Sequence, residues 1–223
     1  MTGARGTADR FRDLIHRRLL PGLADLGFDA RLPGSLAATE ATGVVWLLDL
    51  VVAPWSSPQK VCFTLAWGAS VPGVEEAVGD PVPEHPTIDT CTVRGRLGDR
   101  DDGLEPRWFA LRSRPRFVAP FADQALATRV LTGVRTEVLP ALARLATPVD
   151  VQRHLHEGLV TGRGVPKDDE LRTIRRIAAL SLLLGDRGNA ARWLDHLEAR
   201  SAAAIAPDIV AERLAPIRER LAS

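Results

Sequence analysis

The sequence predicts an α+β protein: an antiparallel sheet of four or five strands with two helices packed on one face, followed by a C-terminal α-helical bundle. Two observations indicate this class. In the first two thirds of the chain, short runs of alternating apolar residues are bounded by Gly and Pro, which is typical of strands. After Thr147 the apolar residues recur only at helical spacing. Strands that follow one another through short links favour antiparallel pairing.

The first expected element is a helix over residues 8–26. Phe11, Leu14 and Ile15 belong to one apolar face with three- and four-residue spacing. Gly27 is expected to end the helix as its C-cap, because Gly readily adopts a left-handed backbone. Pro21 predicts a kink, because a proline inside a helix removes a backbone hydrogen bond.

Five strand-like runs follow this helix. The strongest of them places Val61, Phe63 and Leu65 on one side. The Pro54–Pro58 segment predicts a hairpin connection, and we expect Trp55 within it to be exposed. The Pro- and Gly-rich stretch 70–86 predicts a long loop with one helical turn at 74–78. The expected strands cover residues 29–39, 44–52, 60–69, 87–97 and 107–111.

The rest of the chain is predicted to be helical. A helix over residues 121–145 completes the α+β domain, which we place at residues 1–146. Thr147 is a suitable N-cap and Pro148 a suitable first helical residue, so a helical region over 147–223 is expected to start there. Its helices are expected at 149–157, 168–184, 188–201 and 207–221, with a Gly-rich linker at 158–166. The second and third of these resemble a tetratricopeptide-type hairpin, but no copy recurs at a fixed period.

The composition is that of an ordinary globular protein. Hydrophobic residues make up 45% and charged residues 26% of the 223 residues. Lys and Arg number 29 against 28 Asp and Glu, so the net charge of +1 favours neither nucleic acid nor an anionic membrane as a partner. Because residues 1–10 lack the apolar segment of a secretory signal, we expect a cytoplasmic location. Cys62 and Cys91 are interpreted as small buried hydrophobes and not as a disulfide framework.

The strand expected at 87–97 carries the strongest functional signal. Residues two apart on a strand share a face, so we expect Arg94 and Arg96 to point into solvent together. Such a strand would have one cationic side and one apolar side. The apolar side, which should face the core, is expected to carry Cys91, Val93 and Leu97.

The charge around this strand suggests a binding surface. Between residues 94 and 116 the chain holds seven arginines and four acidic residues, a local charge of +3. Because guanidinium groups bind carboxylates and phosphates in a bidentate manner, we interpret Arg94 and Arg96 as ligand-binding residues for an acidic protein or another anionic ligand. Trp108 would add a stacking surface. In the alternative interpretation, this is a solvated strand face with weak surface pairs to Asp99, Asp101, Asp102 and Glu105.

Three further motifs predict no chemistry. His154 and His156 point to different sides of a helix, whereas metal-binding histidine pairs need a spacing of three or four. The Gly-rich stretch 158–167 lacks the Gly-Lys-Ser/Thr ending and the preceding strand of a phosphate-binding loop. Cys91 is expected in the core and not in a thiolate pair with His85. We therefore predict no catalytic residue, no metal and no cofactor.

Several motifs of the first two thirds of the chain occur in a recognisable order. They are Leu26-Gly27-Phe28 at a helix end, the strand Val61-Cys62-Phe63-Thr64-Leu65, the strand Cys91-x-x-Arg94-x-Arg96-Leu97-Gly98, Trp108 about ten residues later, and Val138-Leu139-Pro140. This order resembles the bacterial domain of unknown function 4304 family over roughly residues 10–146. The resemblance implies an α+β fold with these elements and assigns no catalytic residue. Residues 31–39 depart from the family pattern, which has alternating polar and aromatic residues there.

Two functions are compatible with these residues. The preferred one is a non-catalytic binding module, in which an open sheet face bearing Arg94 and Arg96 takes an acidic protein or an anionic ligand; a toxin-neutralising partner would be a special case. The alternative is an enzyme of unrecognised type with a site formed by Asp49, His85 and the arginines. A deep pocket with Asp49 or His85 turned toward Arg94 would favour the enzyme, and a shallow cationic face would favour the binding module.

Overall fold

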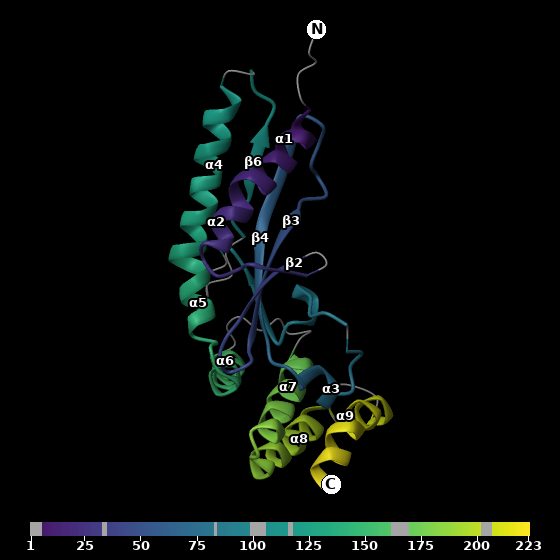
Figure 1. The fold of residues 1–223 in the computed structure, drawn as a ribbon. Coiled ribbons are helices and arrows are strands. Elements are labelled where there is room, and N and C mark those ends of the chain that lie inside the picture. Colours follow the sequence, from purple (N-terminus) through teal and green to yellow (C-terminus); the bar gives the residue numbers. More distant parts are fainter. Residues whose placement is uncertain are drawn as a thin grey trace.

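The computed structural model confirms the α+β class. It describes residues 6–32, 35–82, 84–98, 106–115, 118–161, 170–201 and 207–223. Figure 1 shows an elongated molecule in which helices lie along one side of the sheet, and the last three helices gather at the end opposite the N-terminus.

The sheet is antiparallel throughout. Its strands are β1 (Ala30–Leu32), β2 (Ser35–Thr39), β3 (Val45–Val52), β4 (Lys60–Ser70), β5 (Val93–Arg96) and β6 (Phe109–Arg112). They are arranged in the order β1-β2-β3-β4-β5, and β6 also pairs with β4. β5 pairs with residues 66–69 of β4 and β6 with residues 60–63, both on the side of β4 opposite β3. The sheet is therefore five strand positions wide, in agreement with the prediction.

Two helical segments cover one face of the sheet (Figure 1). The first consists of α1 (Thr7–Leu14), η1 (Ile15–Leu19) and α2 (Leu20–Ala24), and the second of α4 (Ala119–Gly133), η3 (Val134–Val138) and α5 (Leu139–Ala143). Leu19 and Val130 from these segments are fully buried in one apolar core with Phe63 and Leu65 of β4. This confirms the predicted helix layer, whose burial of apolar area is the main favourable contribution to the fold.

Both helical segments contain a π turn directly before a proline. In the first segment the N–H of Leu20 donates to the carbonyl of Ile15, five residues back, and Pro21 follows. The second segment repeats this geometry before Pro140. A proline has no N–H to donate and its ring crowds an α-helical carbonyl, so the wider turn relieves both problems. The kink expected at Pro21 is thus a π turn within a continuous helix.

Two of the predicted strands are wrong in extent. The run 29–39 is divided into the hairpin of β1 and β2. In the run 87–97 only β5 is a strand, because η2 (Ile88–Thr90) forms a 3-10 turn before it. The N–H of Thr87 donates to Oγ1 of Thr90 at 2.9 Å, and this local bond holds the turn against extension into a strand.

The C-terminal region consists of helices, as predicted. They are α6 (Pro148–Thr161), α7 (Glu170–Leu183), α8 (Arg187–Ser201) and α9 (Pro207–Ala222). Oγ1 of Thr147 accepts a hydrogen bond from the N–H of Asp150 at 3.1 Å, which confirms the predicted N-cap. Residues 158–161 of the predicted linker are helical, because α6 continues through them. The rest of that linker and the acidic stretch 99–105 lie outside the described residues.

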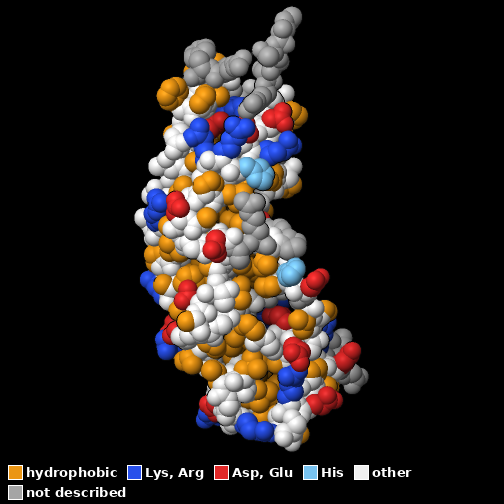
Figure 2. Space-filling model, viewed as in Figure 1, with side chains coloured by type: hydrophobic (Ala, Val, Ile, Leu, Met, Phe, Trp, Pro, Cys, Tyr) orange, Lys and Arg blue, Asp and Glu red, His pale blue; other side chains and the backbone are white. Residues whose placement is uncertain are grey.

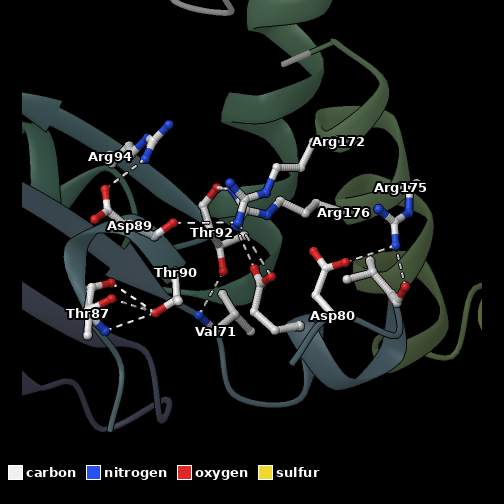
Figure 3. A network of polar contacts seen from close by, with 12 residues as sticks. Val71, Asp80, Thr87, Asp89, Thr90, Thr92, Arg94, Arg172, Arg175 and Arg176 are labelled. Atoms are coloured by element: carbon white, nitrogen blue, oxygen red, sulfur yellow. Dashed lines mark hydrogen bonds and ion pairs between the residues drawn. The ribbon is translucent and has the colours of Figure 1, made fainter. Parts of the chain in front are cut away.

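Buried arginines of α7 join the C-terminal helices to the loop that carries α3 (Val74–Ala77), the helical turn predicted in the long loop (Figure 3). Arg176 donates to Oε1 of Glu75 at 2.6 Å and to the carbonyl of Thr92 at 3.0 Å. Arg175 lies 3.2 Å from Oδ1 of Asp80. The two arginine side chains are only 9% and 8% exposed. We call these two buried pairs, Arg175–Asp80 and Arg176–Glu75, the arginine clamp.

One apolar core runs through both predicted domains. Ile174 and Ile177 of α7 belong to the same buried cluster as Val74 of α3 and Phe63 of β4. The boundary predicted after residue 146 lies in the turn between α5 and α6. The two regions therefore share a core even where the sequence pattern changes.

The surface combines charges of both signs. Figure 2 shows Lys and Arg side chains interspersed with Asp and Glu on the face that it draws, in keeping with the nearly neutral composition. None of the described helices is long and apolar enough to cross a membrane.

We predict that Arg176→Ala lowers the free energy of unfolding by about 3–5 kcal/mol, because it leaves the buried Glu75 carboxylate with only the longer 3.8 Å contact to the more exposed Arg172. Denaturant unfolding followed by circular dichroism measures this change. Arg17→Ala is the matched control, since the Arg17 side chain is 71% exposed and pairs with Asp13 within a helix; it should cost less than about 0.5 kcal/mol. Equal losses in the two variants would contradict a structural role for the clamp.

Candidate functional site on the open face of the sheet

The face of the sheet opposite the helix layer carries a row of small residues from β4. Phe63 and Leu65 of β4 point into the helix-covered core. Side chains alternate along a strand, so the even-numbered residues of β4 point to the other face. On this second face, which we call the open face, the described residues form a small apolar cluster of Ala37, Leu47 and Cys91 that includes no α-helical residue. The β4 residues of the open face are Cys62, Thr64, Ala66 and Gly68.

Arginines form a row along the β5 and β6 edge of the open face. Cross-strand partners in an antiparallel ladder carry their side chains on the same face. Arg94 and Arg96 pair with Gly68 and Ala66, and Arg112 pairs with the first residue of β4. Arg94 and Arg112 lie opposite residues 68 and 60, a span of about 27 Å at the rise of a β-strand. We call Arg94, Arg96 and Arg112 the arginine row.

The two-sided character predicted for β5 is present. Arg94 and Arg96 are exposed, whereas Val93 and Leu97 are buried. Arg94 lies 3.2 Å from Oδ1 of Asp89, but the exposed fractions of these side chains are 42% and 92%. An ion pair this exposed contributes only about 0–1 kcal/mol, so it holds Arg94 weakly. Arg112, which sequence analysis did not single out, is exposed in the same row.

Trp108 forms an aromatic pair on this side of the molecule. It lies one residue before β6, and it is one of the residues that line a cavity between α4 and the β6 segment. Its ring centroid lies 4.9 Å from that of Trp55, in an edge-on arrangement. Trp55 is 61% exposed, which confirms the exposure expected from its Pro-flanked turn. The aromatic surface is therefore made of two indoles, one of which sequence analysis did not assign to the site.

Cys91 is buried, but on the opposite face from the one predicted. A side chain added at Gly68 would overlap Sγ of Cys91, so the thiol lies over the open face and not in the core with Val93. The reason is that Cys91 precedes β5, so strand alternation does not extend to it. Burial raises the pKa of the Cys91 thiol to about 12. It is therefore protonated at neutral pH and is not a thiolate nucleophile.

Within the described residues, no hydrogen bond or ion pair joins Asp49, His85 and Arg94 to one another. Asp49 lies on the open face, paired with Ala66. Burial raises the pKa of its carboxyl group, and the negative charge of Asp89 adds to this increase. His85 is 45% exposed, and its Nε2 lies 4.0 Å from Glu84 Oε1. The imidazole therefore neighbours a surface carboxylate of its own loop.

Three cavities lie beside the helices, and two of them are also lined by a residue of the candidate site, Arg112 in one and Trp108 in the other. One of about 700 Å³ is lined by residues of α6, α7 and α8. Two others, of about 290 and 600 Å³, lie between α4 and the β6 segment. None of the three is lined by Asp49, His85 or Arg94. Within the described ranges, no group of three or more His, Cys, Asp or Glu is placed to hold a metal ion.

Sequence analysis missed the arginine clamp and the polar base of the 700 Å³ cavity. The arginines of α7 do carry a local signal, since Arg172, Arg175 and Arg176 have the spacing of one helix face. That spacing alone does not say whether the face is buried. The polar base is formed by Gln152, Ser181 and Asn189 from three different helices, so no sequence spacing connects them.

The comparisons with known proteins give no relative: no protein-family model, no curated protein and no solved structure matches the chain. The resemblance to the domain of unknown function 4304 family therefore stays a prediction.

We predict that Asp49→Asn stabilises the protein at pH 7. The folded state raises the pKa of Asp49 above its ordinary value of 3.8. Between the unfolded-state and folded-state pKa values, unfolding therefore releases a proton, and the free energy of unfolding decreases as the pH rises through this interval. The asparagine amide of the variant is neutral at every pH, so the variant does not lose this stability. Thermal unfolding at pH 7 and at pH 3 measures the effect: the gain should be present at pH 7 and absent at pH 3. A loss of stability at pH 7 would contradict the assignment.

Proposed function

We propose that this protein is a non-catalytic binding module that takes an extended, acidic segment of a partner protein along the open face of the sheet. The observation that carries the proposal is the arginine row, which places Arg94, Arg96 and Arg112 on one face in one line. Guanidinium groups bind carboxylates through paired, charge-assisted hydrogen bonds. A line of them favours a ligand with repeated carboxylates.

The spacing within the row favours an extended ligand. Arg94 and Arg96 are two residues apart on a strand, a separation of about 6–7 Å. Alternate residues of an extended peptide repeat at the same distance, so acidic side chains at every second position would meet successive arginines. The Trp55 and Trp108 indoles contact each other at the start of β6 and offer a stacking surface near that end of the row.

The burial of the face limits a ligand to the edge that carries the arginines. The β4 residues beside the arginine row have small side chains or none at Cys62, Thr64, Ala66 and Gly68. All four are buried, with Thr64 at 0% and Ala66 at 3% exposure, and the Cys91 thiol lies over Gly68. A ligand would therefore contact the exposed guanidinium groups at the β5 and β6 edge and not the β4 backbone. An enzyme is the weaker candidate, because His85 lies beside Glu84 and the Cys91 thiol is protonated.

The proposal places the protein in the cytoplasm, with a protein partner and no nucleic acid. Cys62 and Cys91 are both free thiols, which the reducing cytoplasm would maintain. The net charge of +1 offers little general attraction to a polyanion. Recognition would depend on the local arrangement of the arginines.

We predict that Arg94→Ala with Arg96→Ala lowers affinity for a fluorescein-labelled peptide of alternating Glu and Thr by at least about tenfold, since each lost charge-assisted bond contributes about 1.5–3 kcal/mol. Fluorescence anisotropy measures the affinity, and a Gln–Thr peptide tests the charge requirement. The melting temperature should be unchanged, because both side chains are exposed.

The matched control is Arg135→Ala with Arg144→Ala, two exposed arginines on the α4–α5 side of the molecule. This control should bind the Glu–Thr peptide as the unaltered protein does. Equal loss in both double variants would show a nonspecific charge effect and reject the open face as the site. Failure of the unaltered protein to bind the Glu–Thr peptide would reject an extended acidic ligand.

A further inference from the structure

Helices α6, α7 and α8 line a cavity of about 700 Å³ that is open to solvent on one side and lies outside the open face of the sheet. This volume is within the range of about 300–1,000 Å³ that is common for small-molecule sites. Apolar side chains from all three helices line it, among them Leu159, Ile174 and Trp193. Such sites typically combine an apolar lining with a few polar groups that fix the orientation of the ligand.

The polar groups at the base of the cavity are held by one buried hydroxyl. Ser181 is 0% exposed, and its Oγ–H donates to the carbonyl of Ile177 at 2.9 Å. The same oxygen accepts hydrogen bonds from Nε2 of Gln152 at 2.7 Å and from Nδ2 of Asn189 at 2.9 Å. These contacts tie α6, α7 and α8 together at this point.

The single hydroxyl proton fixes the direction of both amides. A serine hydroxyl donates only one hydrogen bond, and that bond goes to Ile177. Gln152 and Asn189 must therefore present their NH2 groups to Ser181, and their carbonyl oxygens must point elsewhere. Among the described residues, neither oxygen accepts a hydrogen bond. Both residues line the cavity, so two amide acceptors are available to an N–H donor there.

The wall and the rim of the cavity offer a different chemistry. Trp193 lies edge-on between His156 and His196, with ring centroids 5.4 and 5.7 Å away, so two contacts restrict its indole. Arg192, on the same helix, is exposed at the rim and makes no ion pair within the part of the chain that the structure describes. The rim thus presents a guanidinium to an anion, while Trp193 presents an aromatic surface.

We propose that this cavity binds an aromatic amine that carries an anionic group at its far end, the layout of an aminopurine nucleotide. The exocyclic amino group donates to the amide oxygens of Gln152 and Asn189, the ring packs against Trp193, and the phosphate pairs with Arg192. This site is separate from the arginine row, so a test of nucleotide binding is independent of the proposed peptide-binding function.

Isothermal titration of the full chain with adenosine monophosphate tests the site. Adenosine should bind more weakly, because it lacks the group that pairs with Arg192, and ribose 5-phosphate should bind more weakly because it lacks the amine and the ring. Arg192→Ala should lower the affinity for adenosine monophosphate about tenfold and leave that for adenosine unchanged. The matched control is Arg213→Ala, because Arg213 is an exposed arginine of the neighbouring α9. This variant should bind adenosine monophosphate as the unaltered protein does.

A second variant tests the base of the cavity. Asn189→Leu keeps the size of the side chain but removes one hydrogen-bond acceptor. The affinities for adenosine and for adenosine monophosphate should therefore decrease by the same factor. Thermal unfolding of this variant verifies that it is folded. The proposal would be overturned if the unaltered protein did not bind adenosine monophosphate. It would also be overturned if Arg192→Ala bound adenosine monophosphate as tightly as the unaltered protein, or if the unaltered protein bound ribose 5-phosphate as tightly as adenosine monophosphate.

Discussion

The guanidinium groups of Arg175 and Arg176 lie more than nine-tenths out of solvent, between α7 and the loop that carries α3. Removing a charge from water is costly unless a partner of opposite charge is buried with it. Glu75 and Asp80 provide those partners from a segment about a hundred residues earlier in the chain. Because α7 also packs against α6, α8 and α9, this pairing fixes where the whole helical region meets the sheet domain.

The position of the helical region leaves the β5 and β6 edge of the sheet exposed at Arg94, Arg96 and Arg112. One helix layer covers the face that carries Phe63 and Leu65, and the C-terminal helices pack at the α3 end of the molecule (Figure 1). On the open face, strand alternation then sets small β4 residues beside the arginine row. The cavity arises separately, where three helices meet around the hydroxyl of Ser181. The arginine row and this cavity therefore lie on different parts of the fold.

The sequence was informative wherever structure depends on local periodicity. The helix layer, the Thr147 N-cap and the two faces of β5 follow from spacing that neighbouring residues set by themselves. The position of Cys91 did not follow, because the turn at Thr87–Thr90 delays the start of the strand and sends the thiol to the other face. The arginine clamp and the Ser181 contacts depend on residues from distant segments, and a single sequence does not show which of these meet. Sequence analysis therefore identified Arg94 and Arg96 but not the base of the cavity.

The central physical claim is that the two regions of different sequence pattern form one cooperative structure with a shared core. Differential scanning calorimetry of the full chain tests it most directly. A single transition whose calorimetric and van't Hoff enthalpies agree is the predicted result. Two separate transitions, with the helical region melting independently of the sheet, would contradict it.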